Sequence, residues 1–324
     1  AAVSRKILGV FVERYTHLPT KSNQDAIKYA RAYSSRHSKY EKLSSGSINI
    51  AAKLIPEISP LINNGIQTIP NFWDRKLIED IYNDVHDAYN QIKNITIRDH
   101  SNEEKYEGQQ LNREYVKLKF SSLNDLKGRT SGVTLPDPLL KIPSIYKLLL
   151  DEKLINLISA YYSAIPKLTF LKVRHAFAHE DYSPKDTQMW HYDAGSFRLL
   201  KVLIYLNDVT HKDHGPHEYI RKTHVLNFND PIYQTVRMED DFINKNFSSK
   251  IHTVLSKKED LHFVDATGIH RGRQPQKKDR TVIIANFCLH REYGLPFKRI
   301  KIKKNDFNNF NEKGRALFDD VLLV

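Results

Sequence analysis

The chain has 324 residues, 40% of them hydrophobic and 27% charged, which is an ordinary balance for a globular protein. No stretch approaches the roughly 18 uninterrupted apolar residues that cross a bilayer, so we expect no membrane insertion. Cys288 is the only cysteine, which excludes an internal disulfide and fits a reducing compartment. Charged residues follow the first apolar patch too soon for a secretory leader, and we therefore expect a cytoplasmic protein.

The formal net charge of +12 is the second broad feature of the composition. A surface this basic could attract nucleic acid, anionic lipid or acidic metabolites. The lysines and arginines are mostly spread along the chain, however, and no nucleic-acid-binding motif accompanies them. We therefore expect solvated surface charge and a small-molecule substrate rather than a nucleic acid. Whether that substrate is acidic stays open, as does the oligomeric state.

Residues 1–63 have helical and connective character, and we expect them to form an N-terminal helical extension. A short strand is predicted next at residues 66–69, followed by a turn at Pro70 and Asn71. Apolar residues then recur at helical spacing, which predicts an amphipathic helix with Asp74 as its N-cap.

Residues 100–135 are polar with few periodic signals, and helices interrupted at Pro143 are predicted over 137–163. From about Lys167 onward, short β-rich runs alternate with polar turns, a pattern typical of a sandwich or barrel. We therefore expect a mainly β protein with added helices, an antiparallel double-sheet jelly roll whose helices pack on one face. Its domain would span residues 64–300.

Two further segments complete this expected organisation. Residues 227–250 interrupt the β-rich pattern, and we expect them to form an inserted helical lid or loop. Residues 301–324 are expected to form a C-terminal tail that packs on the core.

A set of metal-ligating residue types lies within the β-rich part. His191 and Asp193 are two apart in a β-type run, so both side chains face the same way and could reach one ion. His270 follows a later strand, and Arg280 lies ten residues beyond it. Two imidazoles and one carboxylate leave three positions open on an octahedral iron, and a guanidinium can bind a cofactor carboxylate in bidentate fashion. The alternatives are a polar strand end or a structural zinc site, with Arg280 as an ion-pair partner of Asp279.

Six segments with family-like sequence span roughly residues 64 to 290: IPNFW, QMWHYD, LKVLIYLNDV, HGPHEYIRKTH, DATGIHRG and DRTVIIANF. In this order and spacing, the chain resembles the phytanoyl-CoA dioxygenase-like family of Fe(II)/2-oxoglutarate-dependent oxygenases. The resemblance implies a double-stranded β-helix core of the cupin-like kind. It also implies His191, Asp193 and His270 as iron ligands and Arg280 as the 2-oxoglutarate anchor. The chain departs from the family at a glycine-serine-histidine turn, which here is Lys222-Thr223-His224.

The resemblance further implies Fe(II) and 2-oxoglutarate as cofactors and O2 as co-substrate. We expect hydroxylation of a small-molecule C–H bond, coupled to decarboxylation of 2-oxoglutarate to succinate and CO2. Because Asp193 is present, halogenation is disfavoured, whereas desaturation and ring closure stay open. Two rival hypotheses are a catalytically silent jelly-roll module that binds a sugar or organic acid, and a zinc enzyme on a similar barrel.

Several other polar residues lie close to these motifs. Gln188 and Arg198 are added as candidate cofactor-binding residues because they flank the first two ligands. Arg198 and Lys201 could hold a cofactor or substrate anion, or could face solvent. His224 is a candidate support for the site. His175 and His179 are too far apart on a strand to bind one ion. We expect solvated turn residues at His211, His214 and His217. A basic rim could be formed by Arg221, Arg237, Arg271 and Arg273.

Overall fold

Two facing sheets form the framework of the described structure. The computed structural model describes residues 23–43, 53–98, 115–180, 186–193, 196–225, 237–290 and 299–324. The larger sheet has the strand order β1 (Ile66–Ile69), β11 (Leu261–Asp265), β7 (Leu200–Tyr205), β13 (Arg280–Cys288), β5 (Lys167–Ala176) and β4 (Gly132–Thr134). All its neighbouring strands are antiparallel.

The smaller sheet carries His191 and His270, the two histidines of the predicted metal site. Its strand order is β10 (Ile251–Thr253), β8 (His217–Ile220), β12 (His270–Gly272), β6 (Trp190–His191) and β9 (Arg237–Met238), again antiparallel throughout. In both sheets, strands far apart in sequence lie side by side, as a jelly roll requires. The expected fold class is thus confirmed.

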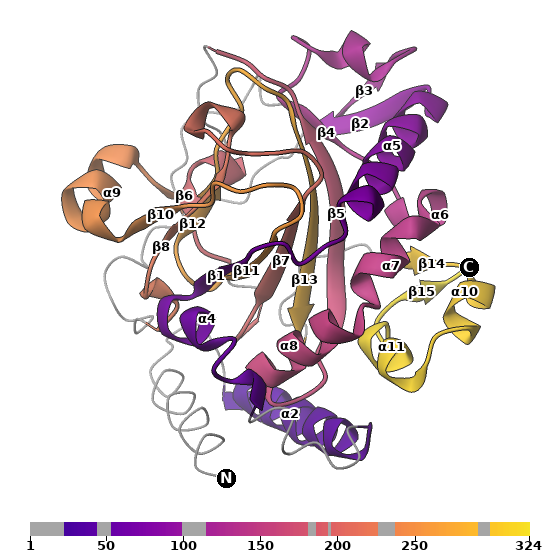
Figure 1. Cartoon of the computed structure of the whole chain (residues 1–324), viewed down its shortest axis with the longest axis vertical. Helices are drawn as coiled ribbons and strands as arrows, with labels where there is room; N and C mark the ends of the chain where they lie inside the picture. The colour runs from indigo at the N-terminus through magenta and orange to yellow at the C-terminus, as the bar shows by residue number, and fades with distance from the viewer. Residues whose placement is uncertain are drawn as a thin grey trace.

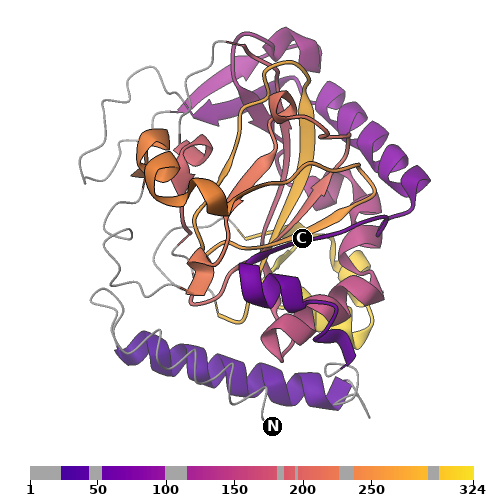
Figure 2. The same cartoon turned by 60° about the vertical axis from the view of Figure 1, so that its left-hand side comes forward.

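The two faces of the larger sheet pack against different layers. Val282 pairs with Tyr205, and both belong to an apolar cluster that includes Tyr219 of the smaller sheet, so this face is the interior of the barrel. Residues at alternate positions, such as Val202 and Ile283, join the main core under the helices. Figures 1 and 2 show α5 and α8 on that outer side, with α9 at the opposite side of the molecule, beyond the smaller sheet.

The predicted helix after the first strand is confirmed as α5 (Arg75–Gln91). The side chain of Asp74 accepts a hydrogen bond of 2.8 Å from the backbone N–H of Leu77, which is the expected N-cap. Ile81 and Val85 on its inner face are fully buried. The other α-helices are α2 (Asn23–Leu43), α4 (Ser59–Asn64), α6 (Pro138–Lys141), α7 (Tyr146–Leu149), α8 (Glu152–Tyr162), α9 (Asp240–Phe247), α10 (Lys304–Asn308) and α11 (Glu312–Leu317).

Arg36 of α2 joins the two ends of the described chain. Its buried guanidinium donates to the carbonyls of Ile165, Pro166 and Ala316, and it forms a 2.9 Å ion pair with Asp319. The residues before β5 and those of α11 therefore meet on one arginine. No helix within the described ranges is long and apolar enough to cross a membrane.

Two pairs of strands lie outside the barrel. β2 (Asn94–Arg98) and β3 (Tyr115–Lys119) are antiparallel, and β14 (Lys301–Ile302) and β15 (Leu322–Leu323) are parallel. Neither β2 nor β3 was predicted, because the polar residues between them hide the pairing. Residues 99–114, part of the stretch that looked featureless, lie outside the described residues.

The interruption of the β pattern contains β9 and α9, while residues 226–236 lie outside the described part of the chain. β9 pairs with the strand that carries His191, with Arg237 directly opposite that histidine. At the start of α9, Asp240 accepts a 2.9 Å hydrogen bond from the indole of Trp190. It also forms an ion pair with Arg271. α9 is thus attached to the smaller sheet through Trp190, which precedes His191, and Arg271, which follows His270.

Candidate metal centre

The side chains of His191, Asp193 and His270 converge at one place. One ligand atom from each lies within 4.8 Å of the other two, and no other group of three such residues occurs in the described ranges. Nε2 of His191 is 3.7 Å from Oδ1 of Asp193, and Nε2 of His270 is 3.9 Å from Oδ2. These separations suit ligands arranged around a single ion.

Strand pairing produces this convergence. His191 of β6 lies directly opposite His270 of β12, and Asp193 follows two residues after His191. The backbone N–H of Asp193 donates to the carbonyl of Ala266 at 2.9 Å, which fixes the loop that carries the carboxylate. Sequence alone predicted the shared direction of His191 and Asp193, whereas the partner strand came from the family resemblance.

Backbone carbonyls set the tautomer of both histidines. Nδ1 of His191 lies 2.9 Å from the carbonyl of Met189, and Nδ1 of His270 lies 2.9 Å from that of Gly268. Because a carbonyl only accepts, Nδ1 carries the proton in each ring and Nε2 keeps its lone pair. Both lone pairs therefore face Asp193, as metal ligation requires.

The protonation states also suit a cation. Burial lowers the pKa of His191 to about 4 and holds the pKa of His270 well below its usual value. Burial acts to raise the pKa of Asp193, but the charge of Lys201 and the neighbouring His191 keep that pKa below its ordinary value. At neutral pH the site therefore presents two neutral imidazoles and one carboxylate.

Lys201 of β7 lies inside this group. Its Nζ is 2.7 Å from Oδ2 of Asp193 and 2.8 Å from Nε2 of His270, and its side chain is only 13% exposed. Of the two alternatives that the sequence left open for Lys201, the solvent-facing one is therefore wrong.

Arg280 is a buried guanidinium at the first residue of β13. It donates to the carbonyl of Arg273 at 3.2 Å, its Nε has no partner, and no carboxylate in the described part of the chain pairs with it. Burial lowers its pKa to about 10. Asp279, the alternative partner, instead lies 3.4 Å from His175 and accepts from the backbone of Ala178.

His217 corrects an expectation. Its loop looked solvated from sequence, yet His217 is the first residue of β8, is 8% exposed and stacks near His270 with ring centroids 5.3 Å apart. Its Nε2 is buried without a partner. The turn ends at Gly215, whose φ of 68° is left-handed, so His217 already belongs to the strand that follows. The Gly-Pro pair before His217 was the available signal.

The other two candidate cofactor-binding residues contact protein groups. Nε2 of Gln188 lies 2.5 Å from Oε1 of Gln274. The guanidinium of Arg198 donates to the carbonyl of Tyr161 at 3.2 Å and lies 4.8 Å from the centre of its ring. A cofactor role for Gln188 and Arg198 stays a prediction.

One of the four expected rim residues is buried instead. Nε of Arg271 lies 2.7 Å from the buried carboxylate of Glu218, so its charge is compensated within the protein. Nη1 of Arg273 lies 3.4 Å from the same carboxylate while its side chain is 35% exposed, and a rim role of Arg221, Arg237 and Arg273 stays a prediction. Among the remaining histidines, His175 bonds with Thr281, and His224 bonds with the carbonyl of Ile62.

The turn that departs from the family keeps a left-handed residue. Lys222, which stands where the family has glycine, has a φ of 68°. The side-chain hydroxyl of Thr223 donates to the carbonyl of Ile220 and accepts from the backbone of Ile269, so the turn is held by local hydrogen bonds. A non-glycine residue in this region costs on the order of 1 kcal/mol, which these bonds offset.

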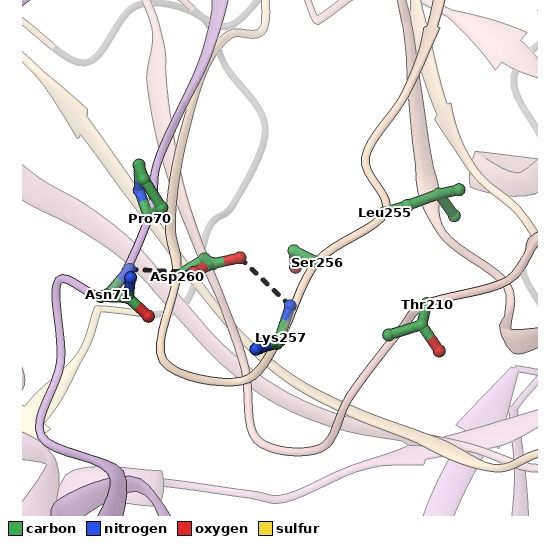
Figure 3. Close-up of a pocket in the computed structure, with 7 residues that line it drawn as sticks. All are labelled: Pro70, Asn71, Thr210, Leu255, Ser256, Lys257 and Asp260. Carbon is green, nitrogen blue, oxygen red and sulfur yellow. Dashed lines mark hydrogen bonds between the residues drawn. The ribbon is translucent and has the colours of Figure 1, made fainter.

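A pocket elsewhere on the protein contains none of the predicted site residues. Figure 3 shows its lining, Pro70, Asn71, Thr210, Leu255, Ser256, Lys257 and Asp260. The Asp260 carboxylate there accepts from the backbone N–H groups of Asn71 and Lys257, so it holds a turn together. The chemistry of the metal-ligand group has no counterpart in this pocket.

Comparison with solved structures agrees with the fold. The non-heme alpha-ketoglutarate-dependent epimerase SnoN from nogalamycin biosynthesis matches with a TM-score of 0.51 and 15% identity, over 76% of this chain and 88% of SnoN. SnoN in complex with Fe3+, alpha-ketoglutarate and nogalamycin RO matches with a TM-score of 0.50 and 17% identity, over 73% and 83%. No protein-family model and no curated protein matches the chain in sequence. The fold is therefore one that a solved alpha-ketoglutarate-dependent enzyme also has.

Proposed function

We propose that this protein is an Fe(II)/2-oxoglutarate-dependent oxygenase that hydroxylates a C–H bond of a small-molecule metabolite. The observation that carries the proposal is the His191–Asp193–His270 group, whose lone pairs and charge are arranged for one cation. The sequence resemblance to the phytanoyl-CoA dioxygenase-like family supports the narrower assignment. Fe(II) is the metal that such a two-histidine, one-carboxylate set with open positions characteristically holds.

The residues around the group fit a dicarboxylate co-substrate. Among the residues that the structure describes, Arg280 is a buried cation without a carboxylate partner, and His217 is a buried imidazole with an unpartnered Nε2. His217 lies directly opposite Gly272 in the smaller sheet, and Arg280 donates to the carbonyl of the next residue, Arg273, so both side chains come from this part of the barrel. A carboxylate bound between them would satisfy both groups, because each can donate a hydrogen bond to it.

Each residue then has a distinct task. His191, Asp193 and His270 would hold the iron, and Arg280 with His217 would bind the distal carboxylate of 2-oxoglutarate. Iron, when bound, supplies reduction of O2, with one oxygen atom going to succinate as 2-oxoglutarate loses CO2 and the other to the substrate. Tyr219 lies directly opposite His270, and Val282 follows two residues after Arg280, so these buried side chains would help to keep water from the reacting centre.

The decisive experiment is a spectroscopic titration without oxygen. Purified protein given Fe(II) and 2-oxoglutarate should develop the visible charge-transfer band of the chelate, and it should release succinate and CO2 under air. His270→Ala and Asp193→Ala should lose both signals, whereas His211→Ala, which removes an exposed loop histidine, should keep them. A silent binding module or a zinc enzyme would give neither signal with the wild-type protein, and that result would exclude the proposal.

A further inference from the structure

The position of Lys201 has a consequence for metal loading. Its ammonium lies within hydrogen-bond distance of both Oδ2 of Asp193 and Nε2 of His270. An ammonium group only donates, so it occupies the single lone pair of Nε2 of His270. That lone pair must face a metal ion if His270 is to bind it, whereas Asp193 keeps Oδ1 for a metal ion.

A lysine in this place and a bound divalent cation exclude each other. Ligand atoms lie about 2.0–2.2 Å from a metal of this size, and an ammonium 2.8 Å from one of them would lie almost against the ion. Two positive centres at that separation repel strongly in a site where His270 is 1% exposed. The ammonium must therefore leave when the metal binds.

The neighbourhood of Lys201 offers the ammonium another place. Lys201 pairs with Asn286 of β13 on the same face of the sheet, and Oδ1 of Asn286 is buried without a partner. The four-carbon stem of lysine is flexible enough to turn from the ligand group toward this face. Its ammonium would still lie near the metal, on the side of the barrel interior.

We infer that Lys201 competes with the metal for the ligand group and, once displaced by the metal, binds the metal-proximal carboxylate of the 2-oxo acid. This inference rests on the proposed function. It assigns Lys201 a positioning role that couples the two cofactors. Metal binding alone has to break the contacts of Lys201 with Asp193 and His270, and the oxo acid gives the displaced ammonium a new anionic partner. The oxo acid should therefore tighten metal binding, and by linkage the metal should tighten oxo-acid binding by the same factor.

The test measures Mn2+ affinity of the full-length protein with and without 2-oxoglutarate, without oxygen and without turnover. Lys201→Met removes the competing cation, so Mn2+ alone should bind roughly ten- to a hundredfold more tightly than to the wild type. The factor by which 2-oxoglutarate tightens Mn2+ should fall by about tenfold or more in the same variant. Lys167→Met is the matched control, because Lys167 is a lysine of the same sheet that contacts Asp319 at 3.7 Å.

The outcomes separate this inference from the proposed function. If the wild type binds Mn2+ and 2-oxoglutarate tightens it, but Lys201→Met behaves like Lys167→Met, the inference is wrong and the proposed function stands. If the wild type shows no such tightening, both fail. Lys201→Gln provides a second uncharged variant should the methionine protein not fold, and weaker Mn2+ binding in either variant would also overturn the inference.

Discussion

Replacing Arg280 with methionine is expected to stabilise the protein and at the same time to weaken its binding of 2-oxoglutarate. Burial lowers the pKa of this guanidinium from its much higher ordinary value to about 10, so the folded state disfavours its charged form at every pH below about 10. Each pKa unit corresponds to about 1.4 kcal/mol, and the buried charge therefore costs roughly 3 kcal/mol. Methionine keeps most of the apolar stem, so we expect the free energy of unfolding to rise by about 1–3 kcal/mol.

The loss of binding is the second half of this prediction. A charge-assisted hydrogen bond contributes about 1.5–3 kcal/mol, so the dissociation constant of 2-oxoglutarate for the Mn2+-loaded protein should rise at least about tenfold. Urea unfolding measures the first effect and calorimetric titration the second, with exposed Arg129→Met as the control. A variant that is less stable and binds 2-oxoglutarate normally would refute the reasoning, because Arg280 would then be a structural residue.

Three further predictions concern buried groups. His217→Phe keeps an aromatic ring but removes the unpartnered Nε2. In calorimetric titration, 2-oxoglutarate should bind about tenfold less tightly, while Mn2+ affinity stays within twofold. Unchanged 2-oxoglutarate affinity would contradict the role of His217. Arg271→Met leaves Glu218 with only the 3.4 Å contact to Arg273 and the hydrogen bond from Thr253, and urea unfolding should show a loss of about 3 kcal/mol, whereas a loss below about 1 kcal/mol would mean that the ion pair is unimportant. Burial lowers the pKa of His262 from 6.5 to about 3, so the folded state resists its protonation and stability should fall by about 1.4 kcal/mol per pH unit as pH drops from 6.5 toward 3. His262→Gln, whose amide can replace the bonds to Thr68 and Ser256, should show a shallower acid slope than the wild type, and equal slopes would exclude His262 as a source.

Local patterns were sufficient for the parts of the fold that depend on neighbouring residues. Asp74 and the apolar spacing after it predicted α5, and the two-residue spacing of His191 and Asp193 predicted their shared direction. What sequence spacing could not show was distance across the barrel. Lys201 reaches the ligand group from the opposite sheet, and this contact depends on how far apart the sheets lie.

Two errors have specific physical causes. His217 was expected in solvent because its loop is polar. The burial of His217 is decided instead by the pairing of β8 with β12, and β8 begins only after Gly215. Arg271 was expected at a rim because it is charged, but Glu218 and Asp240 hold its buried guanidinium in ion pairs. In both cases a partner distant in sequence decided the environment.

The contacts of Arg36 also set an order of events during synthesis. Its guanidinium binds the carbonyl of Ala316 and the carboxylate of Asp319, which lie 280 and 283 residues further along the chain. Because a ribosome makes a chain from its N-terminus, α2 is among the first described elements to be made, and these partners among the last. Docking of α2 through Arg36 can therefore be completed only after Ala316 and Asp319 have been translated.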